Sequence, residues 1–217
     1  MDASIAGIIE EFFARYPARK YGKGQILIFS GEGGDAVYYL IDGRVKQYDV
    51  TYRGDEMILN VFKSPAFFPM SLAINHGTNP YIYEAETEIT VREAPADTVV
   101  SFLKTNPNVL FDLLSRVYSG TDGLLARMMH LMSSSAKARL IYELLIACQR
   151  FGEEDGKGGL TLIMSESDIG SRAGLSRETV SREMKKLVAD GLVADVGRGK
   201  ITINDVSKLE TKLGQVF

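Results

Sequence analysis

The sequence predicts an α+β fold in three consecutive parts: an N-terminal antiparallel β-roll, a long central helix and a C-terminal winged helix-turn-helix. Short apolar runs alternate with glycine and aspartate turns as far as Val91. A helical stripe follows and ends near Met132, and two short helices separated by a glycine come after it. We therefore assign residues 1–96 to the β-roll, 97–132 to the central helix and 133–217 to the winged helix-turn-helix.

Composition limits the class of protein. The 217 residues include 25 basic and 28 acidic side chains, and 45% are hydrophobic, which is enough for a folded core. No apolar run reaches the ~18 residues of a membrane span, and the N-terminus lacks the basic and apolar regions of a secretion signal. The single Cys148 excludes an intrachain disulfide and a multi-cysteine metal cage. We expect a cytoplasmic protein with no metal, no cofactor and no membrane contact.

Short strands account for the first part. Runs such as QILIFS, VYYLI and MILNVF are separated by the turn segments GEGGD, DGR and RGDE. Glycine in each break supplies the positive φ of a tight reversal. Gly31–Gly34 could instead cradle a phosphate, but no helix start follows these glycines. The pattern favours a compact antiparallel sandwich or roll.

Apolar residues at three- and four-residue steps predict a central helix of about 20 residues after Pro107. The core can bury part of this stripe, but a parallel helix from a second chain accounts better for the rest. Gly120 and Gly123 weaken the helix by about 1 kcal/mol each relative to alanine, which a close approach of two backbones would explain. Ser133–Ser135 interrupts the stripe and is the predicted hinge. The predicted dimer seam consists of Leu110, Leu113 (or Leu114), Val117, Leu124, Met128 and Leu131.

The helix-turn-helix is predicted in SESDIGSRAGLSRETVSREMKKLVADGLV, which begins at Ser165. Ser165 and Asp168 have the spacing of a capping box at the start of the first helix. Gly174 ends that helix, because glycine enters the left-handed conformation freely. Ser176 caps the second helix, and Gly170 allows the two helices to cross closely. Two short helices joined at a glycine turn are typical of a helix-turn-helix.

The second helix has an apolar and a polar face. At about 100° per residue, Val180, Met184 and Leu187 point to the core. The polar face begins at the N-terminal end, where a recognition helix meets base edges in the major groove. Arginine suits guanine, glutamate accepts from cytosine, and serine bonds either way. On an isolated helix this would be an ordinary solvated face, but the preceding helix and glycine turn favour DNA binding.

The segments LVADV and KITIN are predicted as two strands of a wing joined by GRG. Basic residues at its tip could contact phosphate, which adds salt-dependent affinity without sequence preference. The predicted DNA-binding residues are Ser165, Ser176, Arg177, Glu178, Ser181, Arg182, Lys185, Arg198 and Lys200.

These segments, above all DIGSRAGLSRETVSREMKKLVADGLV, resemble the cyclic-AMP receptor protein/FNR (CRP/FNR) family of bacterial transcription regulators. The roll segment YGKGQILIFSGEGGDAVYYLIDGRVKQY, the long helix and the wing stand in the family's order. The resemblance implies a cyclic-nucleotide-binding-like jelly roll and a homodimer joined along the central helix. It also implies binding of double-stranded DNA at a roughly palindromic operator, and contact with RNA polymerase.

The resemblance also suggests what the recognition helix reads. Arg177, Glu178 and Arg182 match the base-reading positions of the cyclic-AMP receptor branch. Glu178, Ser181 and Arg182 match those of the FNR branch. A half-site with a TGA-like core is therefore expected.

The chain departs from the family in the cyclic-nucleotide cassette, which carries a Gly-Glu pair and an Arg-Ser pair that hold ribose and phosphate. Here AFFPMSLAINHGTNPYIYEAET has no Gly-Glu near Phe68–Met70 and no Arg-Ser near Asn79–Pro80. Without that arginine, a buried cyclic phosphate lacks its charge partner, so we predict no productive cyclic-AMP binding. An apolar or aromatic small-molecule effector and the absence of any effector both stay open. The residues that could line such a pocket, or that form plain core instead, are Phe67, Phe68, Met70, Tyr81, Tyr83, Val117, Leu124 and Met128.

The remaining reactive residues do not indicate catalysis. Cys148 is interpreted as a small core hydrophobe, His76 as a loop histidine rather than a haem ligand, and His130 as structural or seam-lining. The glutamates of Glu84–Glu88 are interpreted as a solvated strand face. Because no nucleophile elbow or Ser-His-Asp order is present, we do not expect an enzyme. The alternative function is a sensor or adaptor that uses the winged helix for protein contacts.

Overall fold

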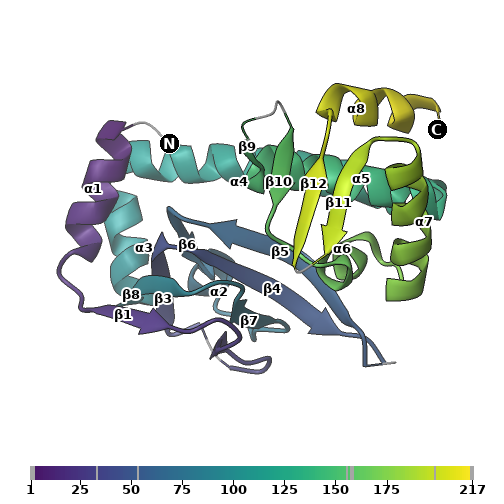
Figure 1. The fold of residues 1–217 in the computed structure, drawn as a ribbon. Helices are drawn as coiled ribbons and strands as arrows, with labels where there is room; N and C mark the ends of the chain where they lie inside the picture. Colours follow the sequence, from purple (N-terminus) through teal and green to yellow (C-terminus); the bar gives the residue numbers. More distant parts are fainter. Residues whose placement is uncertain are drawn as a thin grey trace. The chain divides into compact units, whose positions relative to one another are not determined.

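The structure, a computed structural model, divides into two compact units, Met1–Gly120 and Thr121–Phe217 (Figure 1). None of the helices in the described part of the chain has the length and hydropathy that a membrane span requires. The structure describes residues 3–32, 34–52, 54–154, 156, 159–197 and 199–215.

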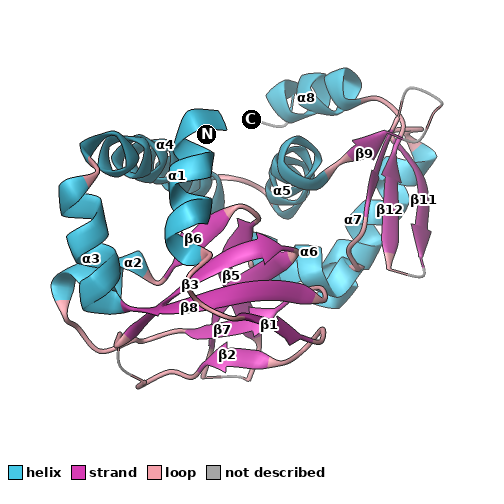
Figure 2. Ribbon diagram, turned by 90° about the vertical axis from the view of Figure 1, so that its left-hand side faces the viewer, coloured by secondary structure: helices cyan, strands magenta, loops and turns pink. Residues whose placement is uncertain are grey.

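Unit 1 contains two four-stranded antiparallel sheets (Figure 2). The strand order is β1-β8-β3-β6 in one, here the β3 sheet, and β2-β7-β4-β5 in the other, here the β4 sheet. This arrangement confirms the predicted antiparallel roll. The elements of unit 1 are α1 (Ala3–Phe13), β1 (Ala18–Tyr21), β2 (Ile26–Ile28), β3 (Ala36–Asp42), β4 (Arg44–Val50), β5 (Glu56–Lys63), β6 (Ala66–Phe68), α2 (Met70–Asn75), β7 (Ile82–Ala85), β8 (Ile89–Pro95), α3 (Ala96–Thr105) and the first part of α4 (Pro107–Ser133).

The β3 sheet has a core cluster on each face, because successive side chains of a strand point to opposite faces. Leu40 packs between the two sheets with Val45 of β4 and Tyr83 of β7. Its neighbour Tyr39 packs on the other face, in a cluster that includes Phe13 of α1 and residues of α3. We call these the inter-sheet cluster and the helix cluster.

The interpretation of Glu84 and Glu86 as solvated is wrong. Their side chains are only 16% and 15% exposed. Glu84 Oε1 lies 3.1 Å from Lys46 Nζ, and Glu86 Oε2 lies 2.7 Å from Arg44 Nε. The cause is strand register, since β7 pairs with β4 and brings Glu84 opposite Lys46.

The range 97–132, assigned to a single central helix, contains most of α3 and α4 with a break at Asn106. Asn106 has φ −125° and ψ 74°. Pro107 disfavours the helical conformation of the residue before it and lacks an N–H group. From Pro107, α4 extends for 27 residues, longer than the expected helix of about 20. The division between the units falls within α4.

Unit 2 is a winged helix-turn-helix, as predicted. Within this unit, α5 contacts α6, α7, α8 and β10. The strands form an antiparallel sheet in the order β11-β12-β10-β9, and α8 is an amphipathic helix that the sequence patterns above did not include. The elements are α5 (Ala136–Phe151), β9 (Glu153–Glu154), β10 (Leu160–Leu162), α6 (Glu166–Ala173), α7 (Arg177–Ala189), β11 (Val193–Gly197), β12 (Lys200–Ile203) and α8 (Val206–Gln215).

Candidate nucleic-acid interface

Helix α6 begins with the predicted capping box. Ser165 Oγ accepts a hydrogen bond from the Asp168 backbone N at 3.1 Å, and the Ser165 backbone N donates to Asp168 Oδ2 at 2.7 Å. Ser165 Oγ also donates to Asp168 Oδ2 at 2.8 Å. These contacts satisfy donors that the first turn of a helix leaves unpaired. The hydroxyl that was predicted to contact DNA therefore holds the helix start, and its DNA contact stays a prediction.

The turn between α6 and α7 follows the predicted glycine pattern. Gly174 is the C-cap of α6, in the left-handed region at φ 61° and ψ 41°. A Cβ at Gly170 would lie 2.9 Å from the Leu175 carbonyl O and 3.2 Å from Val180 Cγ2, which confirms the predicted close crossing. Ser176 then caps α7, its Oγ accepting from the Thr179 backbone N at 3.3 Å.

Helix α7 presents the two expected faces. Val180, Met184 and Leu187 are buried. The predicted base-reading residues lie together in the first half of the helix, where three side chains are exposed and that of Ser181 is half-buried. Lys185 follows one turn later and is also exposed. The exposed residues are Arg177, Glu178 and Arg182.

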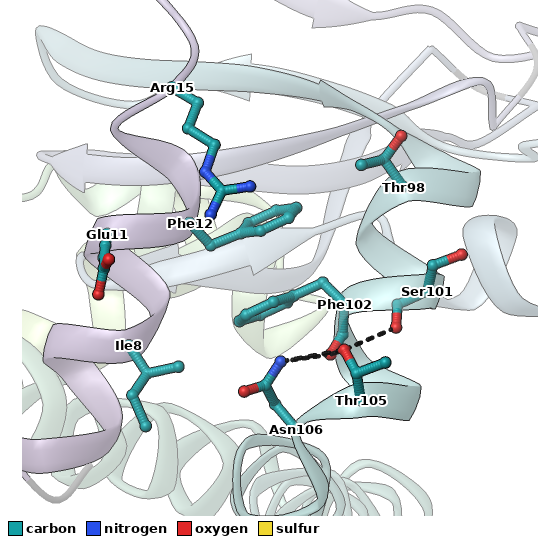
Figure 3. Close-up of a pocket in the computed structure, with 9 residues that line it drawn as sticks. All are labelled: Ile8, Glu11, Phe12, Arg15, Thr98, Ser101, Phe102, Thr105 and Asn106. Carbon is teal, nitrogen blue, oxygen red and sulfur yellow. Dashed lines mark hydrogen bonds between the residues drawn. The ribbon is translucent and has the colours of Figure 1, made fainter.

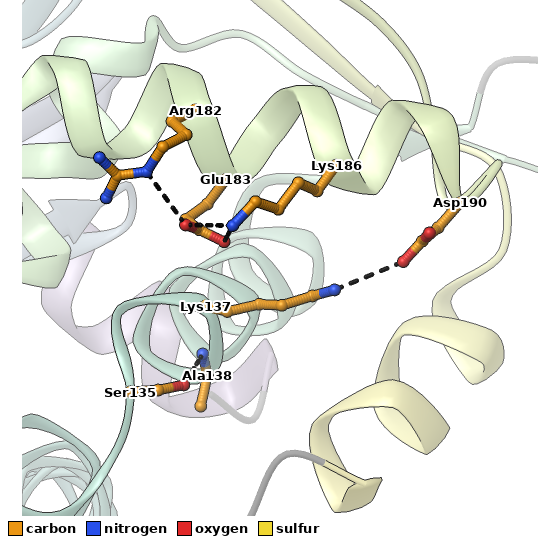
Figure 4. Close-up of polar contacts among 7 residues, drawn as sticks. All are labelled: Ser135, Lys137, Ala138, Arg182, Glu183, Lys186 and Asp190. Carbon is orange, nitrogen blue, oxygen red and sulfur yellow. Dashed lines mark hydrogen bonds and ion pairs between the residues drawn. The ribbon is translucent and has the colours of Figure 1, made fainter.

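Glu183 was missed by the sequence analysis. It is only 6% exposed, although it lies between two basic residues of α7. Its Oε1 is 2.8 Å from Lys186 Nζ and 3.4 Å from Arg182 Nε (Figure 4). The Lys186 ammonium, with a smaller contribution from Arg182, holds the pKa of this carboxyl below its usual value against the effect of burial. Its helical angle, close to that of Leu187, could have indicated burial.

Asp190 connects the C-terminal end of α7 to two neighbouring helices. Its Oδ2 lies 3.4 Å from Lys212 Nζ of α8 and 3.4 Å from Lys137 Nζ of α5. Figure 4 shows the contact with Lys137. The two ammonium groups, Lys212 first, lower the pKa of Asp190. These ion pairs hold the end of α7 that lies opposite the predicted base-reading residues.

The wing consists of β11 and β12. Lys200, predicted to contact phosphate, is exposed at the start of β12. Gly199 precedes it with a positive φ of 73°, which favours glycine. Arg198, also predicted to contact phosphate, lies outside the described residues.

The outer surface of α4 is apolar along much of its length. Of the predicted seam residues, Leu110, Val117, Leu124 and Met128 are exposed. Leu113 packs partly against the helix cluster, whereas Leu114 is exposed, so the structure favours Leu114 as the outward position. Leu131 is half-buried, and the other exposed apolar residues of α4 are Phe111, Tyr118, Leu125, Met129 and Met132.

The residues predicted to line an effector pocket are divided between clusters. Phe67 and Met70 belong to the helix cluster, whereas Phe68, Tyr81 and Tyr83 belong to the inter-sheet cluster. Val117, Leu124 and Met128 are the exposed α4 residues described above.

An aromatic stack occupies the space between the sheets. The ring centroid of Phe68 lies 4.9 Å from Phe62, 5.5 Å from Tyr83 and 5.9 Å from Tyr38. Near the cassette position, the buried Asn79 Nδ2 donates to the Phe29 carbonyl O at 3.0 Å. The Arg-Ser pair that the resemblance leads us to expect is absent near this amide.

A groove of about 440 Å³ lies between α1 and α3, and its lining includes none of the predicted pocket residues (Figure 3). Phe12 and Phe102 stack at 4.0 Å between ring centroids, and the Arg15 guanidinium lies 5.9 Å from the Phe12 ring centroid. Asn106 Nδ2 donates to the Phe102 carbonyl O at 2.8 Å. The lining residues are Ile8, Glu11, Phe12, Arg15, Thr98, Ser101, Phe102, Thr105 and Asn106.

The cysteine and the two histidines contribute to packing or to a helix end. Burial raises the pKa of Cys148 to about 11, so the thiol stays protonated, as expected for a core hydrophobe. His130 is buried with its ring centroid 3.9 Å from that of Tyr142, and burial lowers its pKa. His76 is the C-cap of α2 with φ 52°. Within the described ranges, no three His, Cys, Asp or Glu side chains are arranged to hold a metal ion.

Comparison with known protein families gives matches to both units. A model of the cyclic nucleotide-binding domain matches residues 18–106, and a model of the Crp-like helix-turn-helix domain matches residues 138–212. Both matches agree with the order of the observed elements.

Two curated relatives have similar sequences. The HTH-type transcriptional regulator ArcR of Staphylococcus aureus (strain N315) is 26% identical over 86% of this chain and 80% of the relative. The fumarate nitrate reduction regulatory protein of Klebsiella oxytoca is 27% identical over 89% of this chain and 77% of the relative. Both relatives are named as regulators, and both are covered over more than two thirds of their length.

Solved structures of regulators share the fold. A CRP/FNR-family transcriptional regulator from Thermus thermophilus superposes with a TM-score of 0.75 at 22% identity, covering 92% of this chain and 98% of that chain. The c-di-GMP responsive global regulator CLP of Xanthomonas campestris superposes with a TM-score of 0.78 at 22% identity, covering 91% and 98%. At these identities the likeness concerns the fold.

Proposed function

Because the chain belongs to the CRP/FNR family of transcription regulators, we propose that it binds a palindromic DNA operator as a homodimer. Helix α7 of each protomer enters the major groove of one half-site, which has a TGA-like core. The observation that carries the proposal is the exposed face formed by Arg177, Glu178 and Arg182 at the N-terminal half of α7.

Each side chain of this face has a role in the proposal. Arg182 and Arg177 donate to guanine O6 and N7, Glu178 accepts from cytosine N4, and Ser181 contacts either kind of base edge. Phosphate contacts orient the helix without reading sequence. We assign these to the helix starts at Ser165 and Ser176, to Lys185 in the second half of α7, and to Arg198 and Lys200 of the wing.

The homodimer is proposed along α4. Leu110, Leu114, Val117, Leu124 and Met128 are separated by three, four or seven residues, which is the spacing along the seam of a two-stranded coiled coil. Their exposure in a single chain favours a partner, because soluble monomers rarely expose large contiguous apolar patches. A parallel second α4 would bury them and place the two recognition helices side by side.

The effector in this proposal is not cyclic AMP. The inter-sheet space holds the aromatic stack around Phe68, and Asn79 offers no charge to a phosphate. An apolar effector or none at all is compatible with these contacts. An effector, where present, acts by its different affinity for two arrangements of the recognition helices. DNA-bound dimers are expected to contact RNA polymerase.

The test uses duplexes selected by the wild-type chain from a random library, assayed by electrophoretic mobility shift. Arg182→Ala should lose specific binding by about 1–3 kcal/mol for each lost bidentate contact, while light scattering still shows a dimer. Lys208→Ala is the matched control, because Lys208 is exposed on α8. Unchanged binding by Arg182→Ala contradicts the assignment of α7. A chain that selects no duplex favours the adaptor function instead.

Calorimetry with cyclic AMP tests the effector statement separately. We expect no measurable binding, since a buried phosphate without a cation pays a large desolvation cost. A micromolar dissociation constant would refute the statement without affecting the DNA assignment.

A further inference from the structure

The C-terminal end of α6 is covered by two arginines from other helices. The last carbonyl groups of a helix have no partners within it and carry its negative dipole charge. The Arg172 carbonyl O accepts a hydrogen bond from Arg127 Nη2 of α4. The Gly174 carbonyl O accepts a longer one, at 3.5 Å, from Arg139 Nη1 of α5. Two helices thus hold the end of α6, next to the turn that leads into α7.

Arg127 makes a second contact, with α5. Its Nε donates to Glu143 Oε1 at 2.5 Å. Glu143 is only 5% exposed, so this ion pair is shielded from water and is screened little by salt. Burial raises the pKa of Glu143, and Arg127 is the first of three arginines that oppose this effect. One guanidinium group therefore joins α4, α5 and the end of α6.

Two further contacts lie within one turn of Arg127 on α4. The His130 ring stacks on Tyr142 of α5. Leu131 Cδ2 lies 3.7 Å from the position that a Cβ on Gly174 would occupy. The last turns of α4 are consequently packed against α5 and the turn of the helix-turn-helix.

We propose that Arg127 is a positioning residue for DNA binding. By joining α4 to α5 and to the end of α6, it fixes the direction of α7 relative to the helix that pairs with the second protomer. The inference rests on the proposed function, because only a dimer along α4 converts this direction into a distance between two recognition helices. That distance must be about 34 Å for the helices to reach successive major grooves.

The chemistry of arginine suits this role. Its planar fork can address a carboxylate and a carbonyl oxygen in fixed directions, whereas lysine is a compact point charge on a flexible stem. Arg127→Lys should therefore keep part of the positioning of α7, because the lysine can still pair with Glu143. Removing Arg127 alone leaves Glu143 buried without its nearest cation, which is strongly destabilising. The informative variant is Arg127→Met/Glu143→Met, which removes both charges.

The experiment measures how affinity depends on half-site spacing. In the palindrome selected by the wild-type chain, the spacing between the two half-sites is lengthened or shortened by about one base pair. We expect wild type to prefer one spacing, and the double variant to lose about tenfold in affinity at that spacing and to bind the neighbouring spacings about equally. Affinity for a single half-site should stay unchanged. Arg116→Met is the matched control, because Arg116 of α4 pairs with Asp112 of the same helix at 2.8 Å.

A distance measurement tests, independently of DNA, whether Arg127 positions α7 relative to α4. Nitroxide labels at Asp122→Cys on α4 and Ala189→Cys on α7, with Cys148→Ala, are read by pulsed electron resonance after dilution with unlabelled chain. The inference expects a narrow distance distribution in wild type, a broader one in the double variant, and an intermediate one with Arg127→Lys. An unchanged distribution overturns the inference whatever the DNA result, and so does a double variant that keeps the wild-type spacing preference. A wild type without any spacing preference overturns the proposed function, and the distance distribution then still tests Arg127.

Discussion

The inter-sheet cluster of unit 1 and the polar face of α7 are built in opposite ways. The rings that meet Phe68 come from β3, β5 and β7, far apart in the sequence, and they point inward. The polar groups of α7 come from one run of the chain, residues 177–182, and most of them point into solvent. The first arrangement stabilises a fold by filling its interior, whereas the second offers donors and acceptors to another molecule.

The difference separates two kinds of specificity. A face on one helix can change its partner by single substitutions, because its neighbours do not depend on it for packing. An enclosed cluster cannot change its partner in this way, because each ring packs against the others. Close-packed interiors respond even to a change of a single methylene group. Opening a ligand site inside the inter-sheet cluster would therefore demand a larger change of sequence than altering the polar face of α7.

The largest expected effect is in the enclosed cluster. Phe68→Ala should lower the free energy of unfolding of unit 1 by about 3–5 kcal/mol, because Phe68 is 0% exposed and its removal leaves a cavity. Urea denaturation followed by tyrosine fluorescence measures the loss. Phe29→Ala is the matched control, since that ring is 52% exposed. Equal losses in the two variants would show that the stack does not carry the stability of the roll.

Replacing Gly170 or Gly120 with alanine should change the stability of the protein in opposite directions. Gly170→Ala places a Cβ against the Leu175 carbonyl O and should destabilise unit 2 by about 1–3 kcal/mol. At Gly120 in α4, the same position has no atom within 4 Å from the described residues outside the adjoining backbone of the helix. Gly120→Ala should therefore stabilise the helix by about 1 kcal/mol. Chemical denaturation at low protein concentration compares the two. A Gly120→Ala variant that weakens the dimer would instead indicate close approach of two α4 backbones.

The local features of the helix-turn-helix could be predicted from sequence. The cap at Ser165, the reversal at Gly174 and the outward face at Arg182 depend on residues within about four positions. The same locality explains why the capping box agrees in detail with its prediction.

The non-local contacts could not be predicted. The pairing of Glu84 with Lys46 requires the register of β7 on β4. The contact of Arg127 with Glu143 requires the packing of two helices across the break at Ser134 and Ser135. Phe67 and Phe68, both expected at an effector pocket, belong to different clusters, because successive side chains of a strand point to opposite faces.

The smallest expected effect concerns Glu183, the buried carboxylate beside the exposed face of α7. Its pKa is held below the ordinary value of 4.5, chiefly by Lys186. A carboxyl with a lowered pKa in the folded state contributes stability above the unfolded value, and this contribution is lost as the pH falls through the folded value. Unit 2 should therefore lose stability below about pH 4.5 less steeply in Glu183→Gln than in wild type, by under about 1 kcal/mol.

Denaturation at a series of pH values measures the slope, and Lys186→Met provides the second arm of a double-mutant cycle. If the ion pair is the cause, the double variant should resemble either single variant rather than the sum of both. Additive effects would mean that Glu183 is held by its burial between α7 and the core. In that case the contacts of Glu183 with Arg182 and Lys186 add no stability beyond this burial.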